Sequence, residues 1–282
     1  MTVLWVNGAL VDEAAARVSP MDHGLLTGDG VFETLRVYGG VPFAWDRHLD
    51  RLARSATALG LRLPDPASLR AAAESVIAAN DLGDARLRIT VTGGPAPLGS
   101  ERGDHPPTVI VAVGRLREWP ETEHVVVVPW TRNERGATAG LKTISYAENV
   151  RALAYAHEHG ANEAVFANTR DELCEATGSN VFVVQDGVVR TPPEAAGCLA
   201  GVTRAYILEV SASEGIPCEE VDLPMRALIT ADEAFLTSST REVQAIASID
   251  GAPLPVAPGP VTARLRDAFR ARVAYEVAAL SR

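Results

Sequence analysis

The sequence contains almost no lysine. Lysine and arginine together number 26, and Lys142 is the only lysine among them. It follows Gly140 and Leu141 in an otherwise uncharged run. Partial removal of water lowers the pKa of a lysine and frees its lone pair, so a single lysine in such a place suits an amine nucleophile. An ordinary surface lysine is the alternative reading of this feature alone.

Cysteine and histidine are scarce as well, and neither residue type forms a metal-ligand pattern. The cysteines, Cys174, Cys198 and Cys218, are odd in number and lack the paired spacing of a zinc site. We therefore expect reduced thiols, no metal and a cytoplasmic location. No apolar run is long enough to cross a bilayer, and the N-terminus lacks the basic and apolar regions of a signal peptide. We expect no membrane association.

Positive charge is in deficit. The formal net charge is -10 and the isoelectric point is near 5.1. Nucleic-acid binding needs a basic face, so we expect no nucleic-acid partner. The sequence also lacks the Gly-x-x-x-x-Gly-Lys loop that binds nucleoside triphosphates. A hydrophobic content of 47% and a length of 282 residues allow two compact domains.

Local patterns predict a mixed order of strands and helices. Asn7-Gly8 predicts a hairpin turn, Gly60 ends a helical pattern, and Asp65 suits the N-cap of the next helix. Strands are expected at 3–6, 9–11, 31–38, 86–92, 108–113, 125–128, 163–167, 181–185, 188–190, 233–236 and 242–249. Helices are expected at 45–59, 66–80, 146–159, 202–214 and 261–280.

These elements interleave irregularly, without the repeating βαβ period of a Rossmann sheet or a barrel. The sequence therefore predicts an α/β (α+β) fold. The polar segment 114–123 resembles a linker. We divide the chain into a small α/β domain at 1–115, a linker at 116–120 and a larger domain at 121–282.

Three features after Lys142 point to one kind of ligand. Glu175 precedes a turn of small residues, where a partly buried carboxylate suits a protonated ring nitrogen; a turn-capping acid is the alternative. Gly201, Val202 and Thr203 begin a predicted helix, whose free N–H groups suit a phosphate; a simple N-cap at Thr203 is the alternative.

The third feature is a run of four hydroxyl residues, Thr237-Ser-Ser-Thr240, which follows a predicted strand and again suits a phosphate. Two candidate sites for one phosphate, a carboxylate and a unique lysine together favour a phosphorylated aldehyde as cofactor.

Longer motifs add a family resemblance. They are Asp22-His-Gly-Leu-Leu-Thr-Gly-Asp-Gly-Val-Phe-Glu-Thr34, His48-Leu-Asp-Arg-Leu52 and Ser239-Thr-Arg-Glu-Val243. Over nearly its whole length the chain resembles the fold-type IV pyridoxal-phosphate enzymes. These are D-amino acid and branched-chain aminotransferases, R-amine transaminases and 4-amino-4-deoxychorismate lyase. The resemblance implies a small α/β domain and a larger pseudo-barrel domain that binds pyridoxal 5'-phosphate. It also implies a homodimer with active sites near the subunit interface.

The resemblance assigns roles to residues at matching positions. Lys142 forms the Schiff base with the cofactor and shuttles a proton, and Glu175 pairs with the pyridine nitrogen. Arg51 contacts the phosphate as a charge-assisted donor. The other expected cofactor-binding residues are Leu199, Gly201, Val202, Thr203, Ser239, Thr240, Tyr146, Arg135 and Asn180.

The substrate residues are expected to be Phe32, Thr34, Arg102 and His105. D-amino acid aminotransferases usually carry an Arg-x-His carboxylate trap in the loop that holds Arg102 and His105, and here the two are one residue further apart. Arg102 either grips a carboxylate or lies in a solvated loop.

We expect a transaminase that moves an amino group from a D-amino acid, and also from R-primary amines, to a 2-oxo acid in ping-pong half-reactions. The lyase, which eliminates pyruvate to give 4-aminobenzoate, is the alternative. A branched-chain L-amino acid aminotransferase is less favoured, because its Gly-Met-Gly-Val loop is absent. The presence of both Lys142 and Glu175 argues against a non-catalytic scaffold.

Overall fold

The computed structural model describes residues 2–280, which divide into two compact units. Of the described residues, unit 1 comprises 2–117, 141–146 and 277–280, and unit 2 comprises 118–140 and 147–276. The segment Leu141–Tyr146 thus returns to unit 1 and takes Lys142 with it. The sequence-based division of the chain did not include this return.

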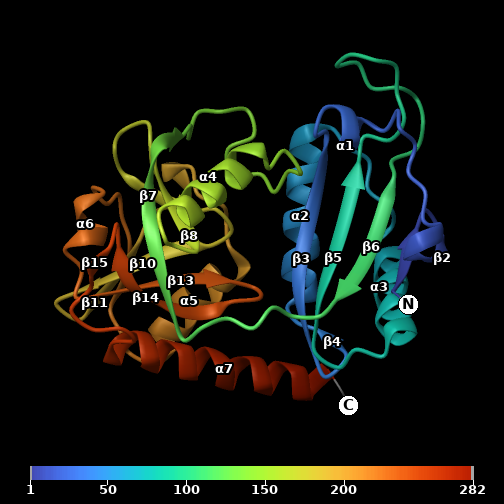
Figure 1. Ribbon diagram of the computed structural model, residues 1–282. Coiled ribbons are helices and arrows are strands. Elements are labelled where there is room, and N and C mark those ends of the chain that lie inside the picture. The colour runs from blue at the N-terminus through green and yellow to red at the C-terminus, as the bar shows by residue number, and fades with distance from the viewer. Residues whose placement is uncertain (1, 281–282) are drawn as a thin grey trace. The chain divides into compact units, whose positions relative to one another are not determined.

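Unit 1 is a six-stranded antiparallel sheet with strand order β2-β1-β6-β5-β3-β4 (Figure 1). Its core is formed by one face of the sheet together with α2 and α3. Its elements are β1 (Val3–Val6), β2 (Ala9–Asp12), η1 (Glu13–Ala15), α1 (His23–Leu26), β3 (Gly30–Tyr38), β4 (Val41–Pro42), α2 (Trp45–Leu59), α3 (Pro66–Asn80), β5 (Ala85–Thr92) and β6 (Val109–Gly114).

Strand alternation decides which side chains of unit 1 enter the core. Along β3, Val31, Leu35 and Val37 are fully buried against the helices. Phe32 and Thr34 alternate with them and therefore belong to the opposite face of the sheet. Alternate residues of β3 therefore lie in the hydrophobic core and on the face that carries the candidate site residues.

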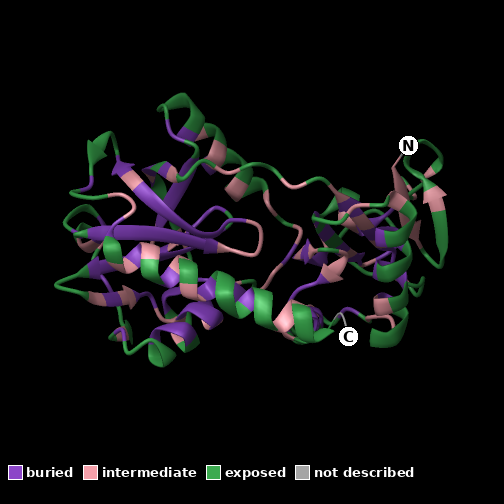
Figure 2. Cartoon of the chain, turned by 90° about the horizontal axis from the view of Figure 1, so that it is seen from below, coloured by how far each residue is buried: buried purple, intermediate pink, exposed green. Residues whose placement is uncertain are grey.

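Unit 2 is built on a nine-stranded mixed sheet with strand order β12-β11-β10-β13-β14-β7-β8-β9, in which β15 pairs with β14. Figure 2 shows that buried residues line most of these strands. The elements of unit 2 are β7 (Thr122–Arg132), α4 (Ala147–Glu158), β8 (Glu163–Asn168), β9 (Leu173–Ala176), β10 (Asn180–Gln185), β11 (Val188–Thr191), η2 (Glu194–Ala196), α5 (Val202–Ser213), β12 (Cys218–Glu220), α6 (Arg226–Ile229), β13 (Glu233–Ser238), β14 (Glu242–Ile249), β15 (Ala252–Pro253) and most of α7 (Pro260–Leu280).

The expected α/β class and the long helices are confirmed, and the differences lie in short or paired segments. Strand β7 is longer than the predicted 125–128, because it pairs with β14 on one side and β8 on the other. Strand β9 lacks a sequence signal and forms because it pairs with β8, so that Glu175 lies within a strand. Helix α1, strand β12 and helix α6 were also not expected.

Residues 2–280 contain neither a helix that is long and apolar enough to cross a membrane nor a cluster of His, Cys, Asp or Glu suited to a metal ion. The three cysteines are free thiols, and burial raises the pKa of Cys198 to about 12.

Gly60 should be required where helix α2 ends. Its φ is +66°, and its N–H donates to the carbonyls of Ala56 and Thr57. An L side chain is disfavoured in this left-handed conformation, so Gly60→Ala should lower the free energy of unfolding by about 1 kcal/mol in urea titrations. Gly83→Ala is the matched control, because Gly83 has an ordinary φ and open space around its Cα. Equal stability of the two variants would contradict this account.

Candidate active site

Lys142 is held along the edge of strand β3 in unit 1. The Phe32 N–H donates to the Lys142 carbonyl at 3.0 Å, and the Ile144 N–H donates to the Gly30 carbonyl at 3.0 Å. The Lys142 N–H donates to the hydroxyl of Ser55, a buried residue of α2, at 3.1 Å. The lysine backbone is therefore fixed by both the sheet and a helix.

The ring of Phe32 is the centre of a cluster that includes the lysine amine. Lys142 Nζ lies 4.5 Å from the ring centroid, and the Tyr146 ring meets Phe32 edge-on with centroids 5.1 Å apart. The Arg88 guanidinium lies 3.8 Å from the Phe32 centroid. Among the predicted site residues of unit 1, the structure thus brings together Lys142, Phe32 and Tyr146. Thr34 lies opposite Arg88 in the β3–β5 ladder.

Arg88 was not predicted from the sequence. Its Nε donates to the Thr90 hydroxyl at 3.1 Å, and no carboxylate pairs with it within residues 2–280. Desolvation lowers the pKa of Arg88, partly offset by the nearby Tyr146. The only available signal was that Arg86, Arg88 and Thr90 alternate along one strand, and sequence alone does not give the register with Phe32.

Arg51 lies in a buried ion pair on the opposite face of β3. Its Nε and Nη2 donate to the two oxygens of Glu33, each at 2.7 Å, and His48 Nδ1 lies 2.7 Å from the same carboxylate. Burial by itself would raise the pKa of Glu33, but the charge and hydrogen bonds of Arg51 and His48 outweigh it and lower this pKa to about 2. The same carboxylate therefore orients both Arg51 and His48. The predicted contact of Arg51 with a phosphate stays a prediction.

Glu175 of unit 2 has two partners. Its Oε2 accepts a hydrogen bond from the Leu199 N–H at 2.8 Å, and its Oε1 lies 3.6 Å from Arg132 Nε. Arg132 is also anchored by Glu148 at 2.5 Å and Asn149 at 3.0 Å. Arg132 is therefore the basic side chain beside the Glu175 carboxylate. Arg132 was missed because nothing in its local sequence distinguishes it from other arginines.

Asn180 and Gly201 connect this carboxylate to the start of helix α5. The Asn180 side chain donates to the Leu199 carbonyl at 2.9 Å. A Cβ at position 201 would lie 1.9 Å from Asn180 Oδ1, so only glycine permits this approach. Gly201 is the N-cap of α5 and provides no side chain for the first N–H groups, which begin at Val202 and Thr203. This is the arrangement that favours an anion at a helix N-terminus.

The turn with Ser239 and Thr240 belongs to the same end of the sheet. It joins β13 to β14, and Thr237 pairs with Asn180 in the β10–β13 ladder. The structure of unit 2 therefore places Glu175, Leu199, Asn180, the α5 N-terminus and the 239–240 turn in one neighbourhood.

Three other predicted residues lie elsewhere. Arg102 is held by Asp29 through two hydrogen bonds of 2.6 Å, and it also donates to the Leu59 carbonyl. His105 is exposed. The sequence predicts Arg102 either to bind a substrate carboxylate or to lie in a solvated loop, and it does not predict the pair with Asp29. Arg135 is mostly exposed, its side chain lies 3.7 Å from Glu134, and Arg132 is the arginine beside Glu175.

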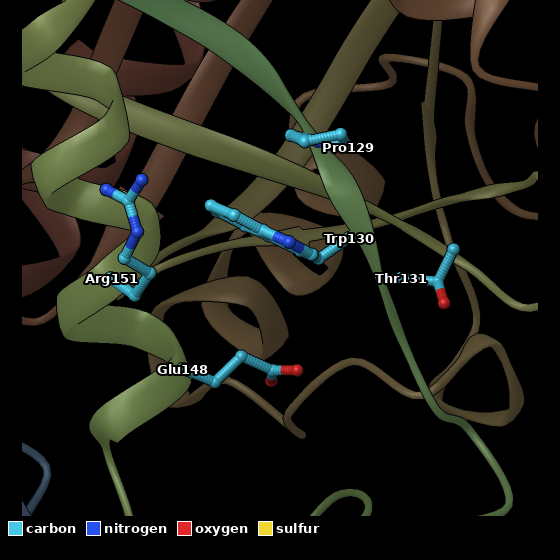
Figure 3. A pocket seen from close by; sticks show the side chains of 5 residues that line it. All are labelled: Pro129, Trp130, Thr131, Glu148 and Arg151. Carbon is cyan, nitrogen blue, oxygen red and sulfur yellow. The ribbon is translucent and has the colours of Figure 1, made fainter.

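A surface hollow of unit 2 contains none of the predicted residues. Trp130 lies between Pro129 and Thr131 on β7, and Glu148 and Arg151 extend toward it from α4 (Figure 3). The Arg151 guanidinium lies 5.2 Å from the Trp130 ring centroid. Of the residues that line it, Glu148 also pairs with Arg132 of the candidate site.

Comparison with known proteins gives consistent matches over most of the chain. A family model described as amino-transferase class IV matches residues 30–249. A D-alanine aminotransferase from Bacillus licheniformis is 33% identical and covers 99% of both chains. A putative branched-chain-amino-acid aminotransferase from Methanocaldococcus jannaschii is 33% identical and covers 95% of both. A branched-chain aminotransferase from Thermoproteus uzoniensis, solved with norvaline, has a TM-score of 0.90 and 29% identity, covering 96% of this chain and 94% of that one.

The buried Glu33 should make stability depend on acid pH. Its folded pKa of about 2 lies below the ordinary 4.5, so its stabilisation is complete above pH 4.5 and is lost as pH falls toward 2. The shift corresponds to about 3 kcal/mol. Glu33→Gln should lower the free energy of unfolding at pH 7 by about 3 kcal/mol or more, because Arg51 loses its partner, and should remove this part of the pH dependence.

Denaturant titrations at several pH values measure both effects. Glu74→Gln is the control, because the Arg70–Glu74 pair is exposed and should contribute less than about 1 kcal/mol. Unchanged acid dependence in Glu33→Gln would contradict the assignment.

Proposed function

This chain belongs to the class IV amino-transferase family, and from that membership we propose that it is a transaminase for D-amino acids. The members of this family use pyridoxal phosphate. The proposed reaction takes the amino group of the donor in one half-reaction and gives it to a 2-oxo acid in the next. R-primary amines are a second proposed donor class.

The residues of unit 2 fit a phosphorylated pyridine. The close approach of Gly201 and Asn180 leaves no room for a side chain at the start of α5, where backbone N–H groups are available to a phosphate. Among the described residues, the buried hydroxyls of Ser179 and Thr237 have no hydrogen-bond partner, and Thr237 pairs with Asn180 in the β10–β13 ladder. When bound, pyridoxal phosphate supplies the aldehyde carbon and the electron-withdrawing ring. We propose that Val202, Thr203, Ser239 and Thr240 hold its phosphate.

The remaining residues either transfer or hold a proton, or fix the position of Lys142. We propose that Lys142 Nζ takes the proton from the substrate Cα, as a general base positioned by its neighbours. Ser55 and β3 fix the Lys142 backbone, and the Phe32 ring face limits the positions of the amine. Glu175, with Arg132 3.6 Å away, pairs with the ring nitrogen and holds a proton there. The single observation that carries the proposal is the fixed position of this one lysine beside Phe32.

The D-amino acid preference has separate support. The motif Gly28-Asp-Gly-Val-Phe-Glu33 resembles that of D-amino acid aminotransferases, and relatives with that activity in their names are 33% identical. A relative named for branched-chain amino acids is equally similar. The hand of the donor therefore needs a direct test.

The half-reaction with no acceptor present provides that test. D-alanine, L-leucine and an R-amine are mixed separately with the holoenzyme, and absorbance follows conversion of the pyridoxal form to the pyridoxamine form. D-alanine and the R-amine should convert it. Lys142→Ala, checked for folding by circular dichroism, should not be converted, because it lacks the base.

The other outcomes name other functions. Conversion by L-leucine alone would make the chain a branched-chain aminotransferase. Release of pyruvate and 4-aminobenzoate from aminodeoxychorismate, without conversion by any donor, would make it the lyase.

We propose further that Arg88, and not Arg102, grips the substrate carboxylate. Arg102 is already held by Asp29, whereas Arg88 lies over Phe32 and has no carboxylate partner in the described chain. A planar guanidinium suits a carboxylate.

Arg88→Gln should raise the KM for D-alanine by about tenfold to a hundredfold. It should leave the KM for an R-amine, which has no carboxylate, near the wild-type value. Arg86→Gln is the matched control: it lies two residues away on the same strand and sheet face, opposite Arg36 in the ladder. Equal losses for both donors, or equal losses in both variants, would contradict this role for Arg88.

A further inference from the structure

Arg241 ends the turn that contains Ser239 and Thr240, and its side chain is buried with two carboxylates. Its Nη1 donates to Glu123 at 2.7 Å, and its Nη2 donates to Glu163 at 2.8 Å. Its side chain is 5% exposed, and those of Glu123 and Glu163 are 0% and 3% exposed. The guanidinium also lies 4.0 Å from the Trp119 ring centroid. Because the planar guanidinium is bound by a carboxylate at each of its two terminal nitrogens, the backbone of the turn at Arg241 has little conformational freedom.

Glu163 connects the same arginine to a second turn. While its Oε2 accepts from Arg241, its Oε1 accepts from the N–H and the hydroxyl of Thr177. Thr177 comes two residues after Glu175 and directly follows β9, which ends at Ala176. One buried carboxylate therefore ties together the turn at 239–241 and the segment that carries Glu175.

The chain of contacts continues to Glu175 itself. The Asn149 side chain donates to the Thr177 carbonyl and accepts from Arg132, and Arg132 lies 3.6 Å from Glu175. Every member of this chain belongs to unit 2. Each hydrogen bond in this network restrains the two segments that it joins.

We propose that Arg241 and Glu163 are positioning residues for the cofactor. Arg241 orients the turn that receives the phosphate, and Glu163 sets the distance between that turn and the carboxylate that serves the ring nitrogen. The inference rests on the proposed function, since it takes Ser239, Thr240 and Glu175 as cofactor-binding residues. A role in stability alone is the competing explanation, because unpaired buried charges are costly anywhere.

The test compares the binding of pyridoxal phosphate and pyridoxal to the apo form of the full chain, followed by absorbance. Arg241→Lys keeps the charge but loses the fork, so it reaches one carboxylate instead of two. It should weaken binding of pyridoxal phosphate by about tenfold or more and leave binding of pyridoxal unchanged. The ratio of the two dissociation constants reports on the phosphate turn, which overall stability does not affect.

Two further variants separate the two ends of the network. Thr177→Val removes one donor to Glu163, so it should keep the wild-type ratio and shift the pH dependence of the absorbance of the bound cofactor. Glu163→Gln should change both the ratio of the two dissociation constants and the pH dependence of the absorbance. Leu265→Ala, in the core of unit 2 on α7, is the control for lost stability and should change neither.

The results distinguish failure of the positioning role from failure of the proposed function. A wild-type ratio in Arg241→Lys, or the same loss in Leu265→Ala, would overturn the positioning role while leaving the enzyme a pyridoxal-phosphate protein. Failure of the wild-type chain to bind pyridoxal phosphate would instead refute the proposed function.

Discussion

A carboxylate that is removed from water must find its partners inside the protein, and this constraint shapes both units. In unit 1, Glu33 is fully buried on β3 and is satisfied by Arg51 and His48 of α2. In unit 2, Glu163 is satisfied by Arg241 and Thr177. The first group joins β3 to α2, and the Glu163–Arg241 pair joins segments 78 residues apart in the sequence. Leaving such a charge without its partner costs several kcal/mol, so the strands and turns that carry these residues have few alternative positions.

The need to pair buried carboxylates also explains why the ion pairs use arginine and not lysine. Arginine presents a planar set of donors that match a carboxylate in two places, as Arg51 and Arg102 do here. Lysine is a point charge that more readily gives up its proton. This chain uses arginine for its ion pairs and retains one lysine, which lies beside an aromatic ring. The position of this single lysine supports the proposal that Lys142 carries the chemistry.

Local patterns predicted much of the fold because local physics controls those elements. Helix α2 ends at Gly60 since only glycine adopts its backbone conformation without strain, and helix α3 begins after Asp65, whose side chain caps it. The turn at Asn7-Gly8 has positive φ at both residues, as the dipeptide predicts. Strand β9 lacked such a signal, because its structure depends on pairing with β8. The same holds for the extension of β7.

By itself, the sequence determined the α/β class, the long helices and the family, with Lys142, Glu175 and the phosphate-type motifs as candidates. These follow from residue type, periodicity and short motifs, which are local properties of the chain. Only the tertiary structure decided which arginine lies beside which group. It placed Arg132 near Glu175, paired Arg102 with Asp29, and put Arg88 over Phe32. Strand register and the packing of distant segments set these pairs, and no local pattern in the sequence encodes them.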